Sequence, residues 1–210
     1  MIGVTKILFQ GDSITFAWRN YDDPVDMGQG FPNMIAGRLG LDAPDQYEFC
    51  NRGVNGSRVV GIYTRIKKDI INEKPDWVSI LIGINDSWLE FTEQAGVDAA
   101  RYKKIYKMLI DEVLEALPNT RFILLEPFVL NGSMTSGFYG LLREQMKLKS
   151  KSVQELAEEY HFPFVALQED LDRMAENVSD EYYLYDGIHP SLAFHQFIAD
   201  KWIEVFKKYE

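Results

Sequence analysis

The sequence contains 210 residues, 46% of them hydrophobic, and carries a formal net charge of −10 at pH 7. This length suffices for one well-packed core, so we expect a single domain over residues 1–210. The negative charge repels phosphate groups, and this disfavours nucleic acids and membrane surfaces as partners.

The chain opens with an apolar segment that is interrupted at Gly11 and Asp12. This segment is too short for a signal sequence or a membrane span, which favours a cytoplasmic location. Apolar segments rich in β-branched and aromatic residues then predict five strands along the chain. They cover residues 4–9, 47–50, 77–82, 121–125 and, more weakly, 164–167.

Segments with helical periodicity lie between these strands. Ser57 resembles an N-cap, and the isoleucines that follow it recur at a spacing of four, at Ile62, Ile66 and Ile70. The next helix ends before Pro118 and carries its apolar stripe at Tyr102, Ile105, Leu109 and Val113. Two more helices are predicted over residues 138–160 and 192–206. The alternation predicts an α/β fold, a three-layer α/β/α sandwich around about five parallel strands.

Ligands of open parallel sheets bind outside the carboxyl ends of the strands, so the residues that follow each strand are the candidates for chemistry. Ser13, within Gly11-Asp12-Ser13, follows the first strand. It is either a nucleophile exposed to substrate or simply a helix N-cap, since serine is common at that position.

Small and amide residues follow the next two strands, in residues 51–56 (NRGVNG) and 83–86 (GIND). A glycine N–H can approach a substrate oxygen closely, and the Asn85 carboxamide can donate a second hydrogen bond. Together they suit an oxyanion site, although asparagine and glycine also dominate ordinary turns.

Asp186 and His189 stand three residues apart, just before the last predicted helix. A carboxylate beside an imidazole fixes its tautomer and stabilises the imidazolium, as a general base for a serine hydroxyl requires. His161 and His195 lack such a neighbour, and we assign both a structural or surface role.

These four blocks resemble the signature blocks of the SGNH, or GDSL-type, hydrolases, in the same order and across almost the whole chain. Ile14 stands where the family often has leucine, an apolar exchange that leaves the nucleophile intact. The resemblance implies a flavodoxin-like fold in which Ser13 attacks an ester carbonyl, with His189 as base and Asp186 orienting it. It also implies an oxyanion hole made by the N–H groups of Ser13 and Gly53 and the side chain of Asn85.

Residues 51–88 are similar to intracellular bacterial esterases that deacetylate sugars, such as acetylxylan esterases. This implies a small-molecule ester as substrate, most simply an acetylated saccharide. As a working hypothesis, we assign three residues to substrate binding: Asp12, Trp18 and Trp88. The reason for the two tryptophans is that an aromatic face suits a pyranose ring. The alternative for the two tryptophans is burial in the core.

Three other functions remain open from the sequence. The same residues would serve a broad short-chain acyl esterase or thioesterase, or a lysophospholipase-like lipase, and an inactive carbohydrate-binding protein could retain the fold.

No cofactor or metal is expected, because the acidic cluster Asp22, Asp23 and Asp26 has no metal-loop motif. The lone cysteine, Cys50, excludes an intramolecular disulfide and is expected to be buried and inert. A homo-oligomer is compatible with the sequence, and the loops 20–31 and 130–138 carry no recognisable motif.

Overall fold

The computed structural model of the protein describes residues 3–210, apart from the side chain of residue 180. Five parallel strands form one sheet in the order β2-β1-β3-β4-β5, which is the flavodoxin-like order. The strands are β1 (Thr5–Gly11), β2 (Tyr47–Asn51), β3 (Trp77–Leu81), β4 (Arg121–Leu125) and β5 (Phe164–Val165). The predicted fold class is therefore confirmed, and each predicted strand is present to within two residues at either end.

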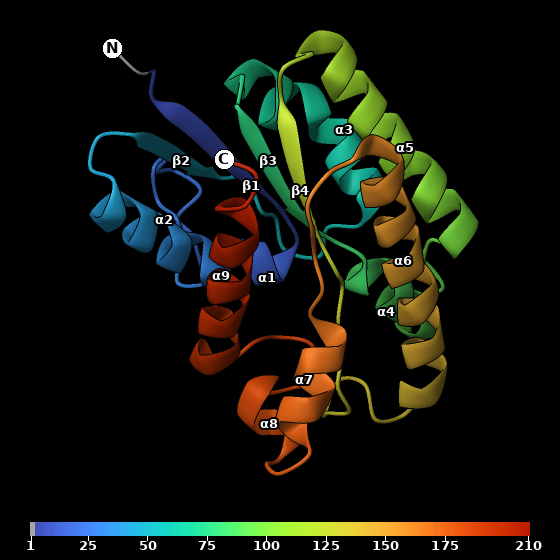
Figure 1. Cartoon of the computed structure of the whole chain (residues 1–210). Helices are drawn as coiled ribbons and strands as arrows, with labels where there is room; N and C mark the ends of the chain where they lie inside the picture. The colour runs from blue at the N-terminus through green and yellow to red at the C-terminus, as the bar shows by residue number, and fades with distance from the viewer. Residues whose placement is uncertain (1–2) are drawn as a thin grey trace.

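Helices cover both faces of this sheet (Figure 1). One face carries α2 (Phe31–Asp42) and α9 (Leu192–Phe206), and the other carries α3 (Val59–Asp69), α5 (Ala99–Ala116) and α6 (Tyr139–Tyr160). Neighbouring residues of β1 show the division, since Ile7 and Phe9 pack with the first set while Leu8 packs with the second. The period-two pattern of buried strands thus builds a separate apolar layer on each side.

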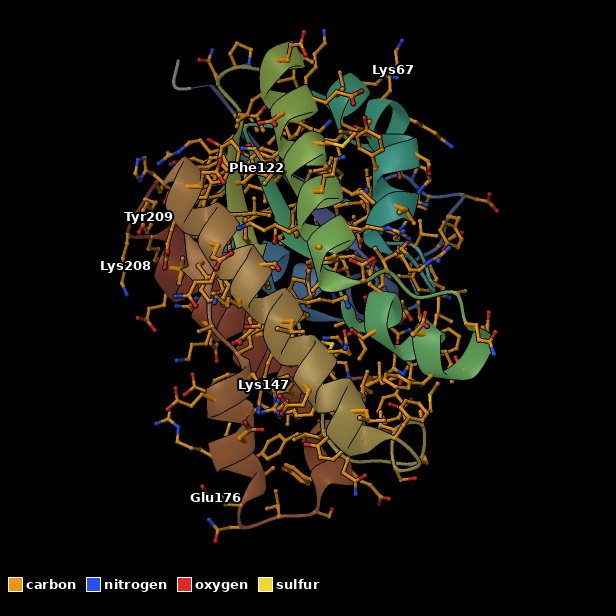
Figure 2. All side chains as sticks on the ribbon, turned by 90° about the vertical axis from the view of Figure 1, so that its right-hand side faces the viewer. Lys67, Phe122, Lys147, Glu176, Lys208 and Tyr209 are labelled. Carbon is orange, nitrogen blue, oxygen red and sulfur yellow. The ribbon has the colours of Figure 1, made fainter. Side chains whose placement is uncertain are left out.

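Figure 2 views the face that α3, α5 and α6 cover. Phe122 of β4 lies behind these helices and is fully buried, whereas Lys67 and Lys147 project outward from α3 and α6. The helices are therefore amphipathic, as the spacing of their apolar residues predicts. None of the helices within residues 3–210 is both long enough and apolar enough to cross a membrane.

Shorter elements complete the fold around the ends of the sheet. They are α1 (Ser13–Phe16), the 3₁₀ helix η1 (Ile71–Glu73), α4 (Ile84–Glu93), α7 (Gln168–Ala175) and α8 (Asp180–Tyr183). Both α1 and α4 begin within three residues of the strands that precede them, at the carboxyl edge of the sheet. Two of the residues predicted to carry chemistry, Ser13 and Asn85, therefore lie on these two short helices, while Asp186 and His189 lie in the segment before α9.

The prediction that Ser57 caps α3 is wrong. Arg58 occupies the N-cap position, and the first backbone N–H of the helix, at Val59, donates instead to the Asp86 carboxylate at 3.0 and 3.1 Å. Asp86 thus pairs a buried N–H that has no partner within the helix, from 27 residues away, so no local capping side chain is needed.

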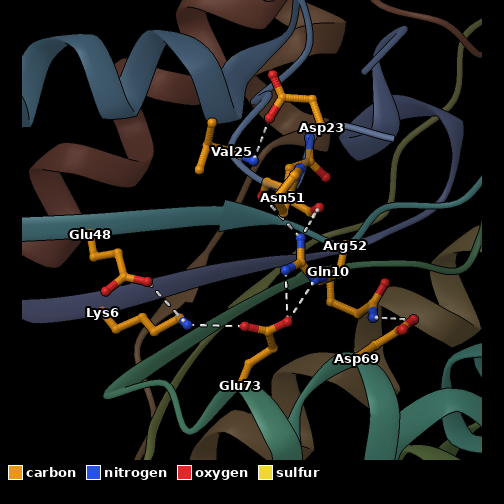
Figure 3. A network of polar contacts seen from close by, with 10 residues as sticks. Lys6, Gln10, Asp23, Val25, Glu48, Asn51, Arg52, Asp69 and Glu73 are labelled. Atoms are coloured by element: carbon orange, nitrogen blue, oxygen red, sulfur yellow. Dashed lines mark hydrogen bonds and ion pairs between the residues drawn. The ribbon is translucent and has the colours of Figure 1, made fainter. Parts of the chain in front are cut away.

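A polar network holds β1, β2 and η1 together (Figure 3). The Glu73 carboxylate accepts from Lys6 Nζ at 2.9 Å and from Arg52 Nη2 at 2.7 Å, and Lys6 also pairs with Glu48. Beside it, the buried Asn51 amide donates to the backbone carbonyl of Thr15 in α1 and to that of Met27 in the loop before α2. The segment that follows β2 is thereby fixed against the start of α1.

Candidate active site

Ser13 is placed by the turn that follows β1. The Asp12 side chain caps α1 by accepting the Ile14 N–H at 3.0 Å, so Asp12, not Ser13, is the N-cap. Ser13 is the first residue of the helix and lines a cavity of about 710 Å³. The interpretation of Ser13 as a capping serine is therefore excluded.

Ser13 and His189 lie near opposite ends of the sequence but are in contact in the fold. Ser13 Oγ lies 2.9 Å from His189 Nε2, and His189 Nδ1 lies 2.6 Å from Asp186 Oδ2. Such an arrangement lets an imidazole take a proton from a serine hydroxyl while the carboxylate holds the ring in place.

A tight turn aims Asp186 at the imidazole. Its other oxygen, Oδ1, accepts the backbone N–H groups of Ile188 and His189, both at 2.8 Å, and Gly187 between them has a positive φ of 93°. Burial alone would raise the pKa of Asp186, but these hydrogen bonds and the one to the His189 ring outweigh burial and lower it. Asp186 is therefore ionised at neutral pH.

The contact with Asp186 shifts the pKa of His189 in the opposite direction. Burial would lower the pKa of the imidazole, but the hydrogen bond and the negative charge of Asp186, together with the charge of Asp12, raise it above the ordinary value. The carboxylate thus stabilises the imidazolium that proton transfer from Ser13 would create.

Asn85 lies in the first turn of α4 and lines the same cavity. Its Nδ2 donates one hydrogen to the Ser57 carbonyl at 3.1 Å, which fixes the orientation of the amide. The nitrogen carries a second hydrogen that remains available to a ligand. Asn85 can therefore offer an oriented donor, as the sequence predicts.

Gly53 does not reach the cavity, and its geometry does not support the predicted role as an oxyanion donor. Its N–H donates to the Asn51 side chain at 2.9 Å, and a Cβ at this position would lie 2.4 Å from the Phe16 nitrogen. Close packing against α1 therefore explains the glycine. Gly56, three residues later and with a positive φ of 68°, lines the cavity in its place.

Both tryptophans named by the sequence line the cavity, and neither is a core residue. Trp18 is 76% exposed and stands at a turn where Ala17 and Trp18 both adopt positive φ angles, of 40° and 62°. Two consecutive non-glycine residues in this region are strained, and the turn presents the indole to solvent. Trp88 is half-buried, and its Nε1 donates to the Met134 carbonyl at 2.9 Å.

Asp12 lies behind the wall of the cavity. Its carboxyl is 1% exposed and does not line the cavity, and burial raises its pKa to about 7. The residue caps α1 and acts on His189 through its charge. This position gives no support to the predicted contact between Asp12 and substrate.

Several cavity residues were not identified from the sequence. Tyr185 stacks on the His189 ring with 5.8 Å between centroids, and the exposed Leu192 stands on the rim. His195 is 8% exposed and lines the cavity, so it is not a surface residue. The sequence assigned it a structural or surface role, and its position in an apolar helical pattern gave no sign that the cavity reaches it.

Two carboxylates of the acidic cluster accept hydrogen bonds from nearby backbone N–H groups. Asp26 accepts the N–H groups of Asn20 and Gly28, at 2.6 and 2.9 Å, and Asp23 accepts that of Val25 at 3.0 Å. Among the described residues, no group of three or more histidine, cysteine or acidic side chains is arranged to hold a metal ion. Cys50 is buried as predicted, and burial raises the pKa of its thiol to about 11.

The sequence and the fold both match known esterases. Residues 9–197 match the model of the GDSL-like lipase/acylhydrolase family. The chain is 31% identical to an acetylxylan esterase from Geobacillus stearothermophilus, over 92% of this chain and 90% of that protein. A GDSL-like lipase from Parabacteroides merdae superposes with a TM-score of 0.90 at 31% identity, covering 98% of each chain.

Crystal structures of catalytic mutants of the Geobacillus acetylxylan esterase also superpose on this chain. One of them gives a TM-score of 0.85 at 29% identity and covers 97% of this chain and 94% of its own. The residues replaced in these mutants are a serine, an aspartate and a histidine. The fold and these relatives define a carboxylic ester hydrolase. The chain belongs to the GDSL-like lipase/acylhydrolase family.

Proposed function

We propose that this esterase removes acetyl groups from saccharides by a serine mechanism in which Ser13, His189 and Asp186 form the catalytic triad. The observation that carries the proposal is the continuous hydrogen-bond chain from Ser13 Oγ to His189 Nε2, at 2.9 Å, and from His189 Nδ1 to Asp186, at 2.6 Å. A serine hydroxyl is a weak nucleophile at neutral pH, so it needs such a base within hydrogen-bond reach.

In the first step, Ser13 Oγ forms a bond to the acetyl carbon while His189 takes the hydroxyl proton. The bond from that carbon to the sugar oxygen then breaks, and His189 returns the proton to the departing sugar hydroxyl. Water repeats the attack on the acetyl-serine, with His189 again acting as base, and releases acetate and free Ser13. Asp186 stays ionised throughout and stabilises the imidazolium.

Negative charge develops on the carbonyl oxygen during each attack. The oxyanion hole that we propose consists of the Ser13 N–H, the Gly56 N–H and the second amide hydrogen of Asn85, with Gly56 replacing the Gly53 of the sequence prediction. All three residues line the cavity. One such donor contributes about 3 to 4 kcal/mol to stabilising the transition state.

Two observations support a saccharide as the alcohol half of the substrate. The acetylxylan esterase that is 31% identical to this chain acts, by its name, on an acetylated polysaccharide. Trp18 stands 76% exposed at the cavity, where its indole face is free to cover the C–H face of a sugar ring. The cytoplasmic location and the single domain over residues 1–210 remain predictions from the sequence.

The decisive experiment compares the hydrolysis of p-nitrophenyl acetate, butyrate and octanoate with that of peracetylated xylose. Deacetylation predicts the highest kcat/KM for acetyl esters and a clear preference for the acetylated sugar. Activity that rises with acyl length would favour the lipase or thioesterase alternative. The Ser13→Ala variant should lose both hydrolysis and covalent labelling by an organophosphonate; labelling that persists would identify another nucleophile.

A further inference from the structure

His195 projects from the first turn of α9 into the wall of the catalytic cavity, although its side chain is 92% shielded from solvent. Its Nδ1 accepts the backbone N–H of Phe31, at the start of α2, at 3.2 Å. A Cβ on the neighbouring Gly30 would lie 2.8 Å from the His195 ring. The imidazole is thus fixed in orientation by the close approach of the α2 backbone.

This hydrogen bond determines the tautomer of His195. A ring nitrogen that accepts an N–H carries no proton, so the proton of the neutral ring resides on Nε2. Burial, with a smaller contribution from the charge of His189, lowers the pKa of His195 to about 4. At neutral pH the ring is therefore uncharged, and its Nε2–H is a donor.

The Nε2–H has no acceptor within the described part of the chain. Nε2 makes no hydrogen bond to residues 3–210, and it does not belong to the fully enclosed polar atoms that lack a partner. Since His195 lines the cavity and its Nε2 is not a fully enclosed atom, we infer that the ring offers this donor to the cavity. An oriented, neutral donor without a protein partner is suited to a ligand acceptor.

We propose that the Nε2–H of His195 binds an oxygen of the alcohol half of the substrate, a sugar hydroxyl or ring oxygen, and so selects saccharide esters over other acetyl esters. This inference rests on the proposed deacetylation. The acetyl group itself offers one carbonyl oxygen, which the oxyanion donors bind, and an apolar methyl group. A further donor in the cavity therefore serves the alcohol, and a saccharide supplies several acceptors.

Two variants of His195 test the roles of its two ring nitrogens separately. Asparagine places its Oδ1 near the position of Nδ1, so His195→Asn keeps an acceptor for Phe31 but removes the donor at Nε2. Glutamine places its amide near the position of Nε2, so His195→Gln keeps the donor and loses the acceptor. The readout is the ratio of kcat/KM for peracetylated xylose to kcat/KM for p-nitrophenyl acetate, which lacks sugar oxygens.

We expect His195→Asn to lower this ratio about tenfold, the worth of one hydrogen bond, and His195→Gln to restore most of it. A ratio in His195→Asn within twofold of the wild-type value would overturn the inference, as would equal losses in both variants. If the wild-type protein shows no preference for the acetylated sugar, the proposed substrate fails first, and this inference fails with it.

A second measurement does not require folded His195 variants. In the Ser13→Ala protein, which would hold the substrate intact, acetylated xylose should shift the ¹⁵N–¹H resonance of His195 Nε2. The same resonance should change less with p-nitrophenyl acetate. Equal shifts with both esters, or none with the sugar, would contradict a contact between His195 and the saccharide.

Discussion

His189 and His195 stand six residues apart and line the same cavity, yet their environments prepare them for opposite roles. His189 faces the ionised Asp186, which raises its pKa, whereas His195 faces a backbone N–H, and burial lowers its pKa to about 4. The first imidazole can therefore gain and return a proton near neutral pH, while the second stays neutral and offers a ligand only the donor at Nε2.

The difference between the two rings comes from the group that holds Nδ1. A carboxylate at this nitrogen requires a proton on Nδ1 and leaves Nε2 as the acceptor for the Ser13 hydroxyl. A backbone N–H at the same nitrogen requires an unprotonated Nδ1 and leaves Nε2–H as a donor. Under the two proposals above, one residue type would thus supply both the base of the mechanism and a fixed contact for the substrate.

The largest effect is expected from His189→Ala. Loss of the base should lower kcat on p-nitrophenyl acetate by about 10⁴- to 10⁶-fold, because the His189 imidazole is the group placed to take the Ser13 proton. His195→Asn provides the matched control, with a loss on this substrate of less than tenfold. Similar losses from the two changes, measured by initial rates on folded protein, would remove the distinction between the two histidines.

A smaller effect is expected from Asn85→Ala. The variant loses a donor to the ester carbonyl, which both substrates share, so kcat should fall about 100- to 1000-fold on each. The ratio of kcat/KM between acetylated xylose and p-nitrophenyl acetate should stay near the wild-type value. Asn55, an exposed amide at the same cavity, serves as comparison, and Asn55→Ala should cost far less. A changed ratio in Asn85→Ala would mean that Asn85 contacts the sugar.

The smallest effect is expected in the pH profile. His189 must be neutral to act as base, so kcat/KM should rise with pH as His189 loses its proton, above 6.5, the ordinary histidine value. Asp186→Asn should move this ionisation to lower pH, because it removes the charge that stabilises the imidazolium. Its rate should be far lower throughout.

His195, with a pKa of about 4, should add no ionisation above pH 5. The measurement is kcat/KM between pH 5 and 9 for the wild-type protein, Asp186→Asn and His195→Asn. A second ionisation near pH 6 that disappears in His195→Asn would show that His195 also titrates in the working range.

The sequence by itself determined the fold class and which segments meet at the site. Apolar strands alternate with amphipathic helices, and parallel strands bring their carboxyl ends to one edge. Local pattern was enough to predict that three site residues lie close together. Each of them follows an apolar segment or precedes a helix, namely Ser13, Asn85 and His189. Trp18 and Trp88 both line the cavity, whereas the sequence left open whether they bind substrate or are buried in the core.

Only the tertiary structure decided the details that depend on distant partners. Ser57 is a good local cap, but Asp86 takes its place, and Gly53 is held away from the cavity by Asn51 and by packing against Phe16. The role of His195 depends on a backbone N–H 164 residues away. Periodicity and capping rules describe neighbours along the chain, whereas hydrogen-bond partners and cavity walls are set by which helices pack together.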